Sequence, residues 1–320
     1  FASTTEKYLK ALEKTQQADT WNSKTALKLE IDHSKASAKT AEKLEMLENV
    51  SVNIDSAEDR VNQKSETKIF LSTGELMLDP VIYTIGEKAF MKSTFTGDKY
   101  ILLNAAQMEE EHQADSDFEQ LGKELQAIWR EAVKDEILES EGSTVKNTPD
   151  GDIKVTQLFL ELDDEKAKAV VNKLITALLQ NEEVRRNLIE GAASSMQLDM
   201  PDEEKQKMAE KWFEELPANI KALKDDLTVE KLKLTARIDR DYYIIDEAIE
   251  AALVLRGEEE VRINLTLDTT MWNINQPVEI EIPQVKEEDM IDMGAMDFQE
   301  SQLSRELMER FGDSAQLGAQ

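Results

Sequence analysis

Residues 231–239 read KLKLTARID, and this stretch decides the fold. Apolar side chains stand at every second position (Leu232, Leu234, Ala236 and Ile238), with charged or polar ones between them. A period of two places these two sets on opposite faces of a β-strand. One face of the strand is therefore expected to be buried and the other to face water.

The same alternation recurs on both sides of a helical region. A first group of strands is predicted within residues 24–103 and a second within 230–282. Between them, residues of the stretch 117–226 place apolar side chains at helical spacing, interrupted by one strand near 153–162. An order of helix, strands, helices, strands is typical of α+β proteins. We expect one curved antiparallel sheet of nine or ten strands, a half-barrel wrapped around the helical insert as a filling or lid.

The domain boundary is expected near the end of the last strand. Residues 1–285 are predicted to form a single domain, with the helical insert at about 117–226, and residues 286–320 to form an acidic, Met-rich tail. Three methionines of this tail recur at every third position: Met290, Met293 and Met296. Thioethers can bind copper(I), but we favour a stripe that docks the tail onto an apolar surface or a protein partner.

Charge and composition exclude several classes of function. The formal net charge is −29, from 67 acidic and 38 basic residues, which argues against a nucleic-acid partner. There is no cysteine, so thiolate chemistry, zinc–thiolate sites and disulfides are excluded. The two histidines, His33 and His112, lie in polar surroundings and make poor candidates for a metal site or a catalytic triad. We predict no catalytic residue, no metal and no cofactor, and hence no enzyme.

Six segments together carry a resemblance to a known family. Its C-terminal part lies in three successive strands and a closing N-x-P-V-x-I-x-x-P motif, and its N-terminal part in a helix followed by a strand: Lys231–Asp239, Tyr242–Leu255, Val261–Leu267, Asn275–Pro283, and Tyr8–Leu12 before Leu27–Ile31. In these segments the chain resembles the LolA/LppX-like lipoproteins, in particular their poorly characterised Gram-positive branch. The long helical insert and the Met-rich tail depart from the family pattern.

The resemblance implies a binding function in the cell envelope. Such proteins hold a lipid or acyl chain in the apolar space between sheet and helices, and have no catalytic residues to transfer. Because the chain opens with Phe1, we expect a leader to have been removed, with an N-terminal lipid anchor on the membrane surface and an extracytoplasmic location. The alternative is a protein-interaction, sensor or envelope-assembly module whose core is filled.

The residues expected to line an apolar ligand cavity come from inward positions of the strands and the insert. They are Leu71, Val171, Leu174, Leu178, Leu232, Leu234, Ile263 and Leu265. The same side chains could equally pack as a solid core, and the sequence leaves these two alternatives open.

Overall fold

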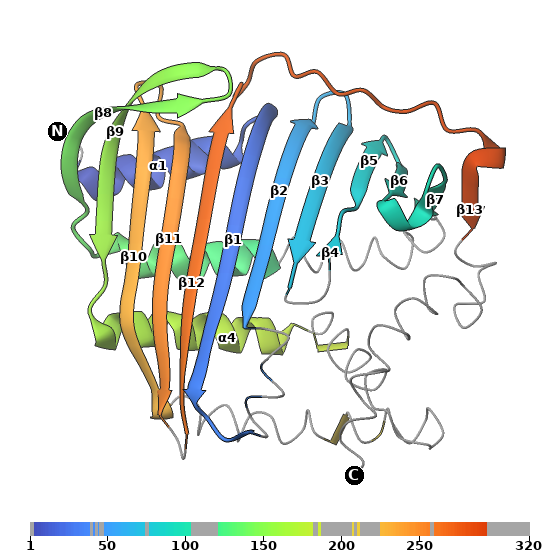
Figure 1. Ribbon diagram of the computed structural model, residues 1–320. Helices are drawn as coiled ribbons and strands as arrows, with labels where there is room; N and C mark the ends of the chain where they lie inside the picture. The colour runs from blue at the N-terminus through green and yellow to red at the C-terminus, as the bar shows by residue number, and fades with distance from the viewer. Residues whose placement is uncertain are drawn as a thin grey trace, which may run out of the picture.

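The computed structural model describes residues 3–38, 41, 44, 48–73, 77–103, 121–181, 185, 186, 207, 210, 211, 225–256 and 259–292. Within these ranges the strands form one 13-stranded sheet, and the longer helices lie on one side of it (Figure 1). The helical elements are α1 (Thr4–Gln16), a helix over residues 121–134, α4 (Asp164–Gln180) and the 3-10 turns η2 (Thr94–Thr96) and η3 (Glu287–Asp289). The strands are β1 (Thr20–Lys35), β2 (Asn49–Asp59), β3 (Lys64–Ser72), β4 (Met77–Leu78), β5 (Val81–Ile85), β6 (Lys88–Lys92), β7 (Tyr100–Leu103), β8 (Glu139–Thr148), β9 (Gly151–Glu161), β10 (Leu227–Asp239), β11 (Ile244–Arg256), β12 (Glu260–Trp272) and β13 (Met290–Asp292).

The two predicted groups of strands are joined into one open sheet by β1. The strand order is β13-β7-β6-β5-β3-β2-β1-β12-β11-β10-β9-β8, with β4 paired to β3. β1 pairs with β2 on one side and β12 on the other, so that Leu29 lies opposite both Val50 and Leu265. All pairs are antiparallel except β13 with β7. The α+β class and the mainly antiparallel sheet are confirmed.

The alternation in KLKLTARID separates the two faces of the sheet. We call the side that carries Leu232, Leu265 and Leu29 the helix face, and the opposite side, with Lys231 and Arg262, the outer face. Leu232, together with Leu234, Ala236 and Ile238, is buried in one cluster with residues of α1 and α4. Lys231 on the outer face pairs with Glu250 of β11. The apolar positions of β10 therefore face the helices, as the period of two predicts.

Local sequence signals fix where two of the helices begin. Ser3 caps α1: its Oγ accepts a hydrogen bond from the Glu6 N–H at 3.1 Å, and the Glu6 carboxylate accepts one from the Ser3 N–H at 2.6 Å. Asp163 caps α4 by accepting a hydrogen bond from the Lys166 N–H at 2.9 Å. None of the helices in the described ranges is long and apolar enough to cross a membrane.

Two local expectations are wrong. The predicted strand at Val278, Ile280 and Ile282 is absent, because this segment crosses the ends of the strands on its way to β13 and cannot join their ladder (Figure 1). Its apolar residues are nevertheless half-buried and its glutamates exposed, so the alternation reflects burial alone. Within the predicted tail, β13 pairs with β7, and the boundary at 286 stays a prediction. The sheet also has more strands than expected.

One of the additional strands, β8, lies within the predicted helical insert. Its residues are almost all exposed, so its sequence lacks the apolar alternation that marks a half-buried strand. The helix over 121–134 and α4 agree with the expected helices of the insert. Most of the stretch 182–224, together with His112, Met293, Met296 and the rest of the predicted tail, lies outside the described residues.

Candidate functional site: a cavity between the sheet and two helices

The eight residues predicted to line a ligand cavity lie on the helix face of the sheet and on α4, and they differ in burial. Leu232 and Leu234 are buried in the core cluster, and Val171 and Leu174 of α4 pack against it. The remaining four are partly or largely exposed: Leu71, Ile263 and Leu265 on the helix face of the sheet, and Leu178, 37% exposed, near the end of α4. Half of the set thus belongs to the core cluster or packs against it, and the role of all eight residues in holding a ligand stays a prediction.

A cavity of about 340 Å³ lies elsewhere on the helix face. It is open to the surface and is lined by residues of α1, the helix over 121–134 and strands β1, β11 and β12, with Arg60 added from the turn after β2. Its lining mixes apolar and polar side chains: Leu12, Trp21, Ile244 and Met271, with Thr15, Gln16, Ser23, Arg60, Gln126, Glu247 and Thr269. None of the eight predicted residues is among them.

A hydrogen-bonded relay supports one wall of this cavity. The Trp129 Nε1–H donates to the Tyr8 hydroxyl at 2.9 Å, and that hydroxyl donates to Glu247 Oε1 at 2.8 Å. Tyr8 is completely buried, and burial, helped by the neighbouring Glu247 charge, raises the pKa of its phenol. The phenol therefore stays protonated and remains a hydrogen-bond donor to the carboxyl group of Glu247.

Glu247 stands at an apolar position of its strand. Burial raises the pKa of its carboxyl group, and the nearby charge of Asp246 acts in the same direction, while the Tyr8 hydrogen bond lowers it. No ion pair to Glu247 occurs within the described part of the chain. This carboxyl group thus combines partial burial, one hydrogen bond and no cationic partner, beside an open volume.

Arg60 is held at the same cavity by the end of α1. Its Nη1 donates to the backbone oxygens of Gln16 at 3.0 Å and Ala18 at 3.2 Å, which satisfies carbonyl groups left unpaired at the helix C-terminus. Its guanidinium group also lies 4.6 Å from the centre of the Trp21 ring. These contacts fix the guanidinium against α1 and Trp21.

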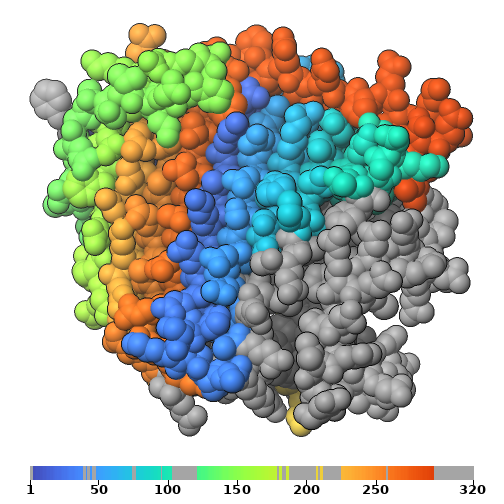
Figure 2. Space-filling model, viewed as in Figure 1, coloured from blue at the N-terminus to red at the C-terminus, as the bar shows by residue number. Residues whose placement is uncertain are grey.

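The outer face carries a second buried polar group, Asp246. Its side chain is completely buried and forms ion pairs with Lys146 of β8 and Arg237 of β10, and it accepts a hydrogen bond from the Thr270 hydroxyl at 2.9 Å. Burial raises the pKa of the nearby Asp268, and the Asp246 charge adds to this shift. The ion pair with Lys146 fastens the β8–β9 hairpin, which lies over the ends of the neighbouring strands (Figure 2). Since its acid is fully paired, we assign this cluster a structural role.

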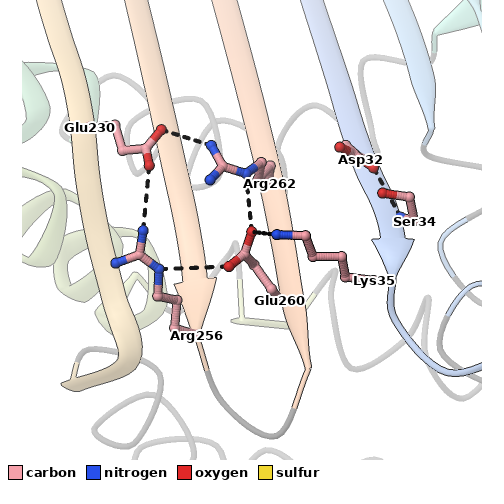
Figure 3. A network of polar contacts seen from close by, with 7 residues as sticks. All are labelled: Asp32, Ser34, Lys35, Glu230, Arg256, Glu260 and Arg262. Carbon is pink, nitrogen blue, oxygen red and sulfur yellow. Dashed lines mark hydrogen bonds and ion pairs between the residues drawn. The ribbon is translucent and has the colours of Figure 1, made fainter.

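A third polar cluster lies on the outer face near the opposite ends of the strands (Figure 3). Glu230 pairs with Arg262 at 3.0 Å and Arg256 at 3.6 Å, and Glu260 pairs with Lys35 at 2.8 Å and Arg262 at 3.2 Å. These side chains are partly exposed, so each pair contributes at most about 1 kcal/mol to stability. Each acid here has basic partners, unlike Glu247.

The structure offers no gathering of metal ligands within the ranges it describes, where no three His, Cys, Asp or Glu side chains lie together. His33 lies at the end of β1, with its Nε2 3.9 Å from Glu48 Oε2 and without a hydrogen bond. The expectation that the protein uses no metal stays a prediction.

Sequence reasoning missed the residues of the relay, although one signal was present. In β11 the residues facing the helices are Ile249, Ala251 and Leu253. Because alternate residues of a strand lie on the same face, Glu247 also faces the helices. A carboxylate at a buried position of a strand indicates a special role, because charged groups are seldom buried without a partner. Nothing in the local sequence shows that Tyr8 and Trp129 meet it.

Comparison with known proteins gives little further guidance. No family model matches the chain, and no curated protein matches it. Among solved structures, the chain is similar to a β-barrel-like protein of the domain of unknown function DUF1849 from Brucella abortus, at 9% sequence identity and a TM-score of 0.20. The match covers 80% of this chain and 99% of that one.

Proposed function

We propose that this protein is a non-catalytic binding module that holds a small, partly apolar ligand between its sheet and its helices. The observation that carries the proposal is the cavity of about 340 Å³ on the helix face. Small-molecule sites usually measure roughly 300–1,000 Å³ and combine apolar walls with a few polar groups. Leu12, Ile244 and Met271 supply such walls here, and Glu247 supplies a polar group.

Kinship with the LolA/LppX-like lipoproteins is part of this proposal. It is supported by the N-terminal helix and by the long, mainly antiparallel sheet with helices against one face. In this proposal the ligand is a lipid fragment, an acyl chain or another amphipathic molecule. The volume of the cavity lies at the small end of the range for small-molecule sites. An extracytoplasmic location and a lipid anchor follow from the resemblance alone and remain predictions.

The test combines a search for a bound ligand with a blocked cavity. Native mass spectrometry of the purified chain is expected to show a bound small molecule that solvent extraction releases. The fluorescent apolar probe N-phenyl-1-naphthylamine should bind the emptied protein. Ser23→Phe, which places a ring in the cavity, should abolish this binding. Ser51→Phe on the outer face of the neighbouring strand is the matched control and should leave it unchanged.

A second candidate is an interaction module with a filled core. It is favoured by the burial of Leu232 and Leu234, which pack in the core cluster with Val170 of α4. If the purified chain carries no small molecule, and if Ser23→Phe binds the probe as well as the native chain does, the interaction module is the better account.

A further inference from the structure

We propose that the cavity takes an organic ammonium ion, a primary amine with a short apolar body, whose nitrogen binds the free oxygen of Glu247. This inference rests on the proposed function, because it assigns a ligand class to the same cavity. It is argued from the hydrogen bonds of Glu247, from the charges around it and from the other residues of the lining.

The hydrogen bonds of Glu247 leave one acceptor unused. Oε1 accepts from the Tyr8 hydroxyl at 2.8 Å, and that hydroxyl is in turn held by the Trp129 Nε1–H at 2.9 Å. Oε2 accepts no hydrogen bond from the described residues, although Glu247 lines the cavity. The relay thus holds the carboxyl group in a fixed position and leaves its second oxygen for a ligand. An ionised carboxylate carries no hydrogen to donate, so a ligand at this oxygen must supply an N–H or O–H donor.

No basic side chain among the described residues forms an ion pair with this carboxyl group. On the other face of the sheet, the buried Asp246 has two basic partners, Lys146 and Arg237. Glu247 has none within the described ranges. Arg60 is engaged with two backbone oxygens and the Trp21 ring. A partly buried carboxylate without a counter-ion is unfavourable, and an incoming ammonium supplies the missing charge. The net charge of −29 also favours the approach of cations.

The rest of the lining fits a small amine. An ammonium group has three N–H donors, and Thr269 and Gln126, whose side chains carry hydrogen-bond acceptors, line the same cavity as Glu247. Leu12, Ile244 and Met271 offer an apolar surface for a short hydrocarbon body. A carboxylate ligand would instead meet the charge of Glu247, and an alcohol would bring a donor without a countercharge.

The test compares three ligands of one length on the full chain by titration calorimetry near neutral pH: n-hexylamine, 1-hexanol and hexanoate. A hydrogen bond to a charged group makes the amine bind roughly tenfold or more tightly than the alcohol. Glu247→Gln should remove this preference by weakening the amine alone. Ser23→Phe should abolish binding of both, and Ser51→Phe should leave both unchanged.

The possible results separate this inference from the proposed function. Equal affinities for amine and alcohol that Ser23→Phe abolishes would overturn the ammonium assignment and leave the binding module standing. Tightest binding of hexanoate, or an amine preference that survives Glu247→Gln, would also overturn the assignment. No binding of any of the three would overturn both. If Glu247→Gln did not fold, the comparison of amine with alcohol on the native chain would still test the ammonium assignment, because equal affinities would overturn it.

Discussion

Replacing Tyr8 by Phe should destabilise the protein by far more than the loss of one oxygen suggests. The Tyr8 hydroxyl is completely buried, accepts from Trp129 Nε1–H at 2.9 Å and donates to Glu247 at 2.8 Å. Phe leaves the indole N–H without a partner, and a buried donor left unpaired costs about 1–3 kcal/mol. It also removes a hydrogen bond to a carboxyl group, worth about 1.5–3 kcal/mol when that group is charged. Because contributions within one hydrogen-bonded network are not additive, we expect a total loss of about 2–4 kcal/mol.

Urea unfolding followed by far-ultraviolet circular dichroism measures this loss without depending on Trp129 fluorescence. Tyr243→Phe is the matched control, because the Tyr243 hydroxyl accepts a single exposed hydrogen bond, from Asn275 Nδ2 at 2.9 Å. It should lower the free energy of unfolding by less than about 1 kcal/mol. A loss for Tyr8→Phe no larger than that of Tyr243→Phe would refute the reasoning, since the relay would then contribute nothing to stability.

Three further predictions concern the acidic residues and the core. Asp246→Asn should lower the free energy of unfolding by about 3 kcal/mol, since it leaves Lys146 and Arg237 unpaired, whereas the exposed Asp241→Asn should change it by less than about 0.5 kcal/mol; equal effects in urea titrations would disprove the structural role of Asp246. Leu234→Ala, at a side chain 1% exposed, should cost about 3 kcal/mol and Leu178→Ala under about 1 kcal/mol by the same assay; a small loss at Leu234 would indicate space rather than packing. Burial raises the pKa of Glu247, so folding favours its protonated form, and the stability this gives is present below about pH 4 and lost as the pH rises through the raised pKa. Glu247→Gln should therefore gain stability relative to the native chain as the pH rises above about 4, and a constant difference would contradict the shift.

The sheet could largely be predicted because its information is local. KLKLTARID shows which side chains face inward, and the same pattern at Leu27, Leu29 and Ile31 predicts β1. β8 could not be predicted, because a strand exposed on both faces has no apolar alternation. At residues 278–282 the sequence predicts a strand that does not form. Half-buried apolar residues alternate there with exposed glutamates outside any strand.

The cavity could not be predicted because it depends on distant elements. Glu247 comes from β11, Tyr8 from α1 and Trp129 from the helix over 121–134, and they meet only through the way these helices cross the sheet. The sequence predicts the cavity residues from the spacing of apolar side chains. The same spacing marks positions that pack well in a core, such as Leu234. A site that mixes apolar walls with a carboxyl group leaves a different signal, a polar residue at an apolar position.

The central claim, that the cavity between the sheet and two helices holds a ligand, is tested most directly at Met271. Its side chain lines the cavity, whereas Met77 on β4 is 60% exposed and lies outside the lining. In a chain labelled with ¹³C at the methionine methyl groups, the Met271 resonance can be assigned with Met271→Leu. Titration with n-hexylamine or N-phenyl-1-naphthylamine should shift the Met271 signal and leave that of Met77 in place. A saturating titration that shifts Met77 and leaves Met271 unmoved would contradict the claim.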